Sequence, residues 1–165
     1  GETAQGVLAL NSYPTAEPRL TRLIGLSWGP WDLAADLGAA SNKDADGNHA
    51  FTYRMAMSMT LLAAKAAGVQ AIDTVHTDFK DDAGLLALCK NISREGWTGK
   101  LAIHPAQVPI IHEGFRPGAE EVAVAERIIK AFADATDGVV ALDGVMLDRP
   151  HLKQAEVILA LRDAL

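Results

Sequence analysis

Cysteine is almost missing from this 165-residue chain, because Cys89 is the only one. A single cysteine cannot form an internal disulfide, so the sequence points to a reducing compartment and we expect a cytoplasmic protein. Runs of lysine or arginine are missing too, and the formal net charge of -6 argues against a nucleic-acid-binding surface. Any anionic ligand must therefore be held by a local site.

Long apolar runs are also lacking. No stretch approaches the roughly 18 uninterrupted apolar residues of a membrane span, and no secretory signal pattern is recognisable, so we expect no membrane partner. The sequence contains no internal repeat, low-complexity tract or long linker. What it does contain, 49% hydrophobic and 22% charged residues, is the composition of an ordinary globular domain with a core.

Three short apolar stretches, bounded by glycine or polar residues, predict buried strands. They cover residues 22–29, 69–75 and 99–105. Continuous apolar runs of this kind are typical of parallel strands that are covered on both faces. A fourth strand is expected to end just before Glu2.

Helical patterns alternate with these strands. The spacing of apolar residues predicts helices over residues 3–12, 51–67, 81–95 and 120–135, and Pro30 and Asp32 suit the first turn of another. Strands that alternate with helices of about a dozen residues are typical of βαβ units around a parallel sheet. Three clear strands are too few for a closed eight-stranded barrel, which needs about 250 residues. The pattern by itself predicts a short open sheet or part of a larger α/β fold.

The last part of the chain has a different pattern. Asp143 and Gly144 stand between the apolar runs "VVAL" and "VMLD", which predicts a hairpin with a type I′ turn. Residues 150–165 follow as a terminal helix. We therefore expect two domains, residues 1–118 with the parallel sheet and residues 119–165 with the hairpin and helices.

Two carboxylates follow strands at a spacing that can bring them together. Function gathers at the carboxyl ends of strands in parallel α/β folds. Glu2 and Asp32 are thirty positions apart, about the length of one βαβ unit at roughly 30 residues. Two carboxylates that leave room for water suit Mg²⁺. The spacing alone favours a structural alternative, in which Asp32 caps its helix and Glu2 is solvated.

Two other motifs predict less. Residues 25–29 fit the G-x-S-x-G pattern of serine hydrolases, but Ser27 falls inside a predicted strand and not at a sharp turn directly before a helix. The loop "DADGNH" has the spacing of a calcium site, but Met55 stands where a calcium loop needs Glu. A chance match and a solvated loop are the better interpretations.

Five stretches together resemble the citrate lyase beta-subunit and malyl-CoA lyase group of the HpcH/HpaI aldolase family. In chain order they are "ETAQGV", "GPWDLAADLG", "AAGVQAIDTVHTDFKDDAGL", "GKLAIHPAQVPIIHEGF" and "VVALDGVMLDRPHLKQAEVIL". The resemblance implies the C-terminal half of a (β/α)8 TIM barrel, from the end of its fifth strand through its eighth, with a C-terminal hairpin–helix extension. It also implies that the half with the substrate-binding arginine is absent, so the isolated segment is expected to be inactive.

The resemblance implies roles for individual residues as well. Glu2 and Asp32 match the family's magnesium ligands, and Asp148 matches the catalytic carboxylate that the extension delivers into a neighbouring subunit's site. The residues expected to line the substrate pocket are Gly29, Pro30, Trp31, His104 and Pro105. A homo-oligomer, a trimer or a hexamer, is therefore implied.

The implied activity is that of a magnesium-dependent C–C lyase. It would cleave or form a 3-hydroxyacyl-CoA of the malyl-, citramalyl- or citryl-CoA type, with an acyl-CoA and a 2-keto acid as its partners. The alternatives are an acyl-CoA thioesterase or a 2-keto acid aldolase on the same fold, and a catalytically silent subunit or binding module. Trp31 stands where citrate-lyase-like relatives usually have Glu, and His76 where many carry Tyr, so the substrate stays open.

Overall fold

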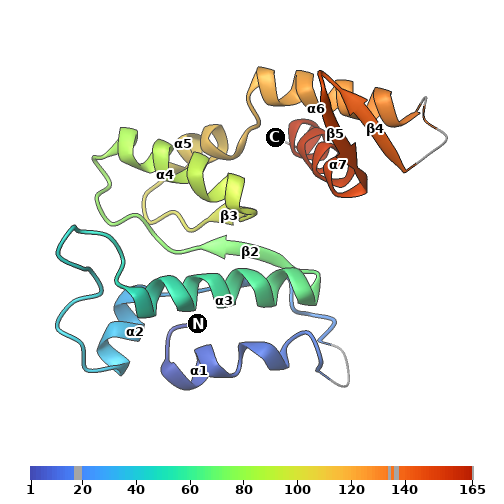
Figure 1. Cartoon of the computed structure of the whole chain (residues 1–165). Helices are drawn as coiled ribbons and strands as arrows, with labels where there is room; N and C mark the ends of the chain where they lie inside the picture. Colours follow the sequence, from blue (N-terminus) through green and yellow to red (C-terminus); the bar gives the residue numbers. More distant parts are fainter. Residues whose placement is uncertain (17–19, 134, 136–137, 165) are drawn as a thin grey trace. The chain divides into compact units, whose positions relative to one another are not determined.

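The computed structural model describes residues 1–16, 20–133, 135 and 138–164. It divides into two compact units, the sheet unit Gly1–Gly114 and the C-terminal unit Phe115–Leu165 (Figure 1). Within the described ranges, no helix is long and apolar enough to cross a bilayer.

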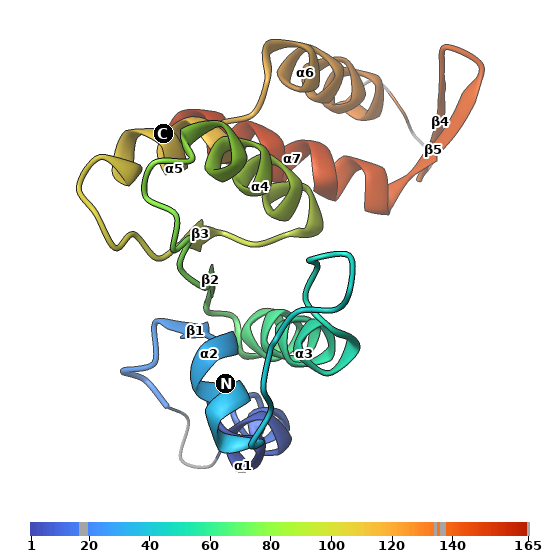
Figure 2. The same ribbon diagram turned by 90° about the vertical axis from the view of Figure 1, so that its left-hand side faces the viewer.

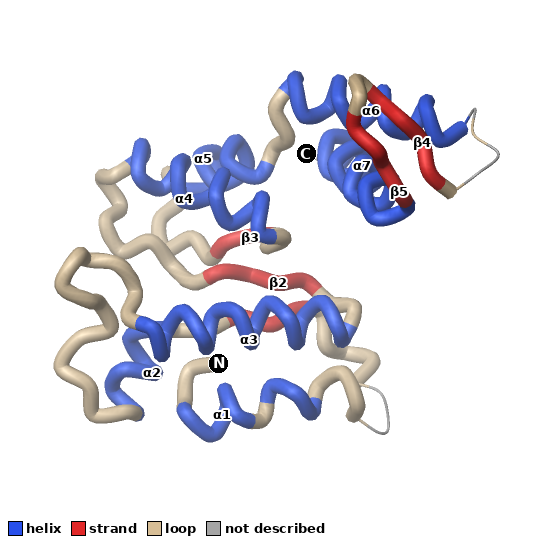
Figure 3. The backbone as a smooth tube through the Cα atoms, viewed as in Figure 1, coloured by secondary structure: helices blue, strands red, loops and turns tan. Residues whose placement is uncertain are grey.

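A three-stranded parallel sheet in the order β1-β2-β3 forms the centre of the sheet unit (Figure 3). The strands are β1 (Gly25–Ser27), β2 (Gln70–Asp73) and β3 (Gly99–Lys100). The register places Leu26 opposite Ala71. Asp73 stands opposite Lys100, so side chains from neighbouring strands meet on one face of the sheet.

Gly1 lies beside β1 like the end of a further strand. Its nitrogen donates to the Ser27 carbonyl at 2.9 Å, and the Gly29 N–H donates to the Gly1 carbonyl at 3.3 Å. This is the hydrogen-bond pattern of parallel neighbours. The contact agrees with the strand end expected before Glu2, and it places Glu2 just beyond the carboxyl end of the sheet.

The predicted strands are longer than the observed ones, and the third prediction is wrong over most of its length. Residues 101–105 form a loop. The Leu101 N–H makes the last ladder bond, to the Asp73 carbonyl at 3.0 Å. The chain then turns where the Ile103 N–H donates to Gln107 Oε1 at 2.9 Å. An apolar run forms a strand only where a neighbouring strand can pair with it. β2 pairs with this run no further than Leu101.

Helices and a 3₁₀ turn complete the sheet unit. They are α1 (Ala4–Leu8), the 3₁₀ turn η1 (Leu10–Ser12), α2 (Pro30–Asp36), α3 (Phe51–Ala67), α4 (Asp82–Glu95) and α5 (Gln107–Phe115). The prediction for α3 is confirmed, because the helix has the predicted bounds. Gly68 ends it with a left-handed φ of 69°. The sequence pattern did not predict α5, whose first turn contains Pro109. Proline is tolerated there because the first N–H groups of a helix have no intrahelical partner.

The core of the sheet unit lies between the strands and their covering helices. Its largest fully buried side chains include Trp28, Leu33, Leu85 and Ile92. Cys89 is also fully buried, and burial raises the pKa of its thiol to about 11. That thiol is therefore a packing group and not a nucleophile.

The C-terminal unit contains two helices and a hairpin. Its elements are α6 (Ala119–Ala133), β4 (Val139–Leu142), β5 (Val145–Asp148) and α7 (Arg149–Ala164). The predicted turn is confirmed, since Asp143 and Gly144 both have positive φ, 52° and 78°. α6 packs against α7 (Figure 2), with Ala125 and Ala155 each only 1% exposed. Residues 134 and 165, at the ends of two predicted helices, lie outside the described ranges.

Candidate metal and catalytic site

Glu2 and Asp32 converge on Gly29. Glu2 follows the Gly1 pairing with β1, and Asp32 stands in the first turn of α2. A Cβ atom built on Gly29 would lie 2.9 Å from Glu2 Cγ, 3.1 Å from Glu2 Oε1 and 3.0 Å from Asp32 Oδ2. Both carboxylates thus lie close to one point, which a side chain at position 29 would fill.

The terminal ammonium group of Gly1 attracts Glu2, but among the described residues no side-chain cation forms an ion pair with either carboxylate. Both side chains are exposed, and among the residues that the structure describes neither has a recorded hydrogen bond or ion pair. Two like charges at one point disfavour each other unless a cation lies between them. No cluster of three or more His, Cys, Asp or Glu suited to a metal exists in the described part of the chain. Two carboxylates fit Mg²⁺, which keeps several of its waters, better than a metal that needs a full protein cage.

Asp32 is not the N-cap of α2. The N-cap of α2 is Gly29, and Pro30 occupies the first helical turn. Asp32 is the third helical residue, where its charge favours the positive end of the helix without capping it. The structural alternative that Asp32 is the cap is therefore wrong.

The serine-hydrolase pattern has no supporting geometry. Ser27 is the last residue of β1, and α2 begins three positions later. The Ser27 hydroxyl is buried without a hydrogen-bond partner among the described residues. A serine nucleophile needs an adjacent base, and none contacts this hydroxyl.

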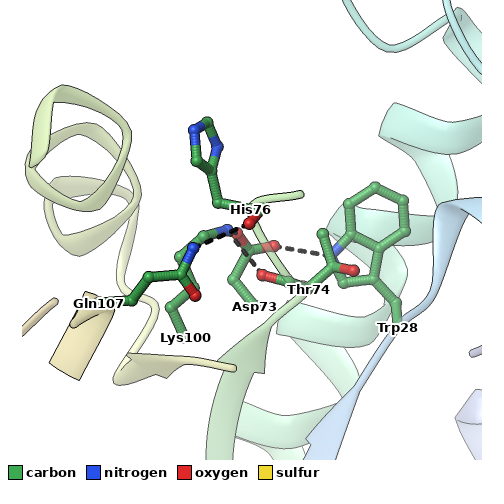
Figure 4. A network of polar contacts seen from close by, with 6 residues as sticks. All are labelled: Trp28, Asp73, Thr74, His76, Lys100 and Gln107. Atoms are coloured by element: carbon green, nitrogen blue, oxygen red, sulfur yellow. Dashed lines mark hydrogen bonds and ion pairs between the residues drawn. The ribbon is translucent and has the colours of Figure 1, made fainter. Parts of the chain in front are cut away.

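A buried polar network joins the ends of the three strands (Figure 4). Lys100 Nζ donates to Asp73 Oδ2 at 2.7 Å and to the Thr74 carbonyl at 2.6 Å. The Trp28 indole N–H donates to Asp73 Oδ1 at 2.8 Å. The sequence motifs did not predict this network. Its signal was a charged residue inside each of two apolar runs, "AIDTV" and "GKLAI", because Asp and Lys are almost never fully buried unless paired.

Gln107 extends the network to the loops that follow β2 and β3. Its amide Nε2 donates to the His76 carbonyl at 2.9 Å, and its Oε1 accepts the Ile103 N–H. The Gln107 side chain is only 1% exposed. One buried amide therefore fixes two loops at the carboxyl ends of neighbouring strands.

The expected pocket residues differ in how far they are available to a ligand. Trp31, His104 and Pro105 are exposed, whereas Gly29 and Pro30 are buried. The His104 ring stacks on Phe79 with centroids 5.7 Å apart. Trp31, His104 and Pro105 therefore present surface to solvent, whereas Pro30 does not.

Asp148 is the last residue of β5, and α7 begins directly after it. Its Oδ1 lies 2.6 Å from Nδ1 of His151, and both side chains are about half exposed, 48% and 44%. Asp148 belongs to the C-terminal unit, so its role in a neighbouring subunit's site stays a prediction.

The family model described as HpcH/HpaI aldolase/citrate lyase matches residues 2–105. The chain belongs to this family. The predicted membership is thereby confirmed, and the matched range includes Glu2, Gly29 and Asp32. It ends before the C-terminal unit.

Relatives of this HpcH/HpaI chain include enzymes with different names. Mitochondrial citramalyl-CoA lyase of Rattus norvegicus is 36% identical over 97% of this chain and 48% of that protein. A (3S)-malyl-CoA thioesterase of Cereibacter sphaeroides is 36% identical over 99% of this chain and 55% of that protein. The chain thus spans about half the length of the curated relatives it matches.

A solved structure shows the same α/β fold. The protein CitE from Mycobacterium tuberculosis, in complex with magnesium, acetoacetate and coenzyme A, is 35% identical with a TM-score of 0.85. The match covers 98% of this chain and 58% of that one. The predicted α/β class is confirmed, and the HpcH/HpaI chain has a fold similar to about half of a CitE-type TIM-barrel protein.

Proposed function

We propose that this chain forms part of a magnesium-dependent C–C lyase that acts on a 3-hydroxyacyl thioester of coenzyme A. The observation that carries the proposal is the convergence on Gly29 of two carboxylates, Glu2 and Asp32, that have no ion-pair partner among the described side chains. The citramalyl-CoA lyase relative and the CitE complex with magnesium, acetoacetate and coenzyme A support it. In this scheme Gly1 ends the fifth barrel strand, and β1 to β3 are strands six to eight.

Each proposed residue has a separate task. Glu2 and Asp32 would hold Mg²⁺, which supplies Lewis-acid polarisation of the substrate's carboxylate and hydroxyl or keto oxygens. Gly29 leaves the space between them open. Trp31, His104 and Pro105 line the substrate side, where Trp31 sets specificity.

The proton balance gives Asp148 its role. In cleavage the bond between C2 and C3 of the acyl chain breaks, and the C3 hydroxyl becomes the keto group as its proton passes to solvent. The electron pair stays on C2 of the acyl-CoA, where the Asp148 carboxyl group delivers a proton. In the reverse direction the Asp148 carboxylate removes that proton. This scheme places Asp148 in a neighbouring subunit's site, in a trimer or hexamer located in the cytoplasm.

Metal titration tests the first half of the proposal. Calorimetric titration with MgCl₂, together with Mn²⁺ titration followed by electron paramagnetic resonance, should show a binding site that Asp32→Ala and Glu2→Ala remove. Asp46→Ala is the matched control, because it deletes an exposed carboxylate of the same charge in the loop before α3. If Asp32→Ala binds either ion as the parent chain does, the metal assignment is wrong.

Product analysis separates the lyase from its rivals. In the protein that carries this sequence, a lyase converts malyl-CoA or citramalyl-CoA into an acyl-CoA and a 2-keto acid only with magnesium. A thioesterase, which the (3S)-malyl-CoA thioesterase relative favours as second candidate, would release free coenzyme A and the hydroxy acid. An aldolase would act on free 2-keto acids, and a silent subunit would turn over none of them.

A further inference from the structure

Asp148 and His151 form a close pair at the start of α7, and its geometry allows two positions for one hydrogen atom. His151 Nδ1 is 2.6 Å from Asp148 Oδ1, and the Asp148 backbone N–H donates to Nδ1 at 3.2 Å. While Asp148 is ionised, Nδ1 either donates to Oδ1 or accepts the backbone N–H, so the two contacts are alternatives. The contact with Oδ1 is the shorter one, and a hydrogen bond from an imidazole N–H to a carboxylate is charge-assisted. Positioning of the carboxylate requires the first state, which assigns the hydrogen to Nδ1.

This assignment leaves the two oxygens of Asp148 unequal. Oδ1 is occupied by the imidazole, and no other contact of the Asp148 carboxylate is recorded among the described residues. Oδ2 is thus the oxygen available to a ligand. The backbone on both sides is held, because β5 pairs with β4 and α7 packs against α6. The remaining freedom of Asp148 is the rotation of its own side chain, and the His151 bond restricts that rotation.

We infer that His151 is a positioning residue, which holds Asp148 through Oδ1 so that Oδ2 faces the substrate carbon. The inference rests on the proposed catalytic role of Asp148. A competing explanation is purely structural, since an N-terminal residue pair three positions apart resembles a capping box that stabilises the helix. The two explanations differ in what Nδ1 does, since positioning requires it to donate to Oδ1, whereas a capping box requires it to accept the Asp148 N–H.

Three substitutions separate them. His151→Asn places an amide N–H near the position of Nδ1, His151→Gln places one near that of Nε2, and His151→Leu removes the donor. A positioning role predicts that kcat falls about 10-fold in the Leu and Gln variants, the size expected for losing a hydrogen bond to a charged group. The Asn variant should stay within about threefold of the parent, and KM should change little in all three.

The outcomes distinguish this inference from the proposed function. If Asp148→Asn turns over like the parent protein, the catalytic role of Asp148 is wrong, and the positioning role falls with it. If Asp148→Asn is inactive while all three His151 variants match the parent, only the positioning role is wrong. Losses of kcat that follow the losses of thermal midpoint across the three variants would show a capping role and overturn the inference.

The hydrogen assignment has a readout that needs no activity. The ¹⁵N chemical shifts of the His151 ring in the folded chain distinguish a protonated Nδ1 from a protonated Nε2. We expect Nδ1 to be protonated in the parent. Because this protonation depends on the carboxylate, Asp148→Asn should change the ¹⁵N shift of Nδ1. An Nε2–H tautomer with bare Nδ1 would overturn the inference whatever the kinetics show.

Discussion

In the sheet unit the Asp73–Lys100 ion pair is buried, whereas the ion pairs seen among the described residues of the C-terminal unit lie at the surface. The Lys100 and Asp73 side chains are 0% and 3% exposed. Arg127 with Asp143, in contrast, is 51% and 65% exposed. The desolvation cost of an ion pair therefore differs between the two units. Removal of charges from water costs several kcal/mol per ion, and exposed pairs avoid that cost.

The two units therefore suit different roles in the proposed reaction. Both oxygens of Asp73 accept a hydrogen bond in the buried pair, from Trp28 on one and from Lys100 on the other, so the pair fixes the strand ends near the Glu2–Asp32 site. The C-terminal unit keeps Asp148 accessible and held by a single imidazole. A metal site needs fixed ligands, while a proton-transfer group must be reachable by substrate.

The largest expected effect is the loss of the buried cation. Lys100→Met leaves Asp73 as an unpaired buried charge, which should lower the free energy of unfolding by about 3–5 kcal/mol. Urea unfolding followed by circular dichroism measures it, with Lys90→Met on the exposed face of α4 as control. A Lys100→Met midpoint equal to that of the control would mean that the buried pair does not stabilise the sheet unit.

The hairpin turn of the C-terminal unit should give the next effect. Gly144 has φ of 78°, so Gly144→Val introduces a β-branched side chain in a left-handed conformation and should cost about 1–2 kcal/mol. Gly144→Asn is the matched variant, because asparagine tolerates this conformation. Thermal unfolding should rank parent, Asn and Val in that order, and equal midpoints for Asn and Val would contradict the turn.

His49 should make the sheet unit sensitive to acid. Burial lowers the pKa of this imidazole, and the nearby Lys43 cation lowers it further. Its ring edge packs on Trp28 with centroids 5.3 Å apart. The unfolded chain takes up this proton near pH 6.5 and the folded chain resists it, so stability is lost as pH falls below about 6.5. The fall between pH 7.5 and 5 should be smaller in His49→Gln; an unchanged fall would exclude His49 as its source.

Breaking an exposed pair should have the smallest effect. Arg127→Ala removes the partner of Asp143 at the hairpin, which should cost only about 0.2–1 kcal/mol. Because salt screens exposed charges, the difference from the parent in thermal midpoint should shrink between 0.05 and about 1 M NaCl. If Arg127→Ala lowers the free energy of unfolding as much as Lys100→Met does, the buried and exposed ion pairs do not differ in their contribution to stability.

Local sequence chemistry predicted the elements that depend on neighbours along the chain. Gly68 ends α3 and Asp143-Gly144 form the turn between β4 and β5 because positive φ favours these residues wherever they occur. The prediction failed for residues 101–105, where an apolar run has no strand to pair with. It also missed α5, because a proline in the first turn hides the helical pattern.

The sequence by itself determined the family, the α/β class and the candidate acids Glu2, Asp32 and Asp148. Only the tertiary structure decided that Glu2 and Asp32 share the space at Gly29 and that Asp73 is buried against Lys100. The physical reason is that residue type and spacing constrain the backbone over a few positions. The distance between side chains tens of positions apart, in contrast, is set by strand register and by which face each strand turns to its helices.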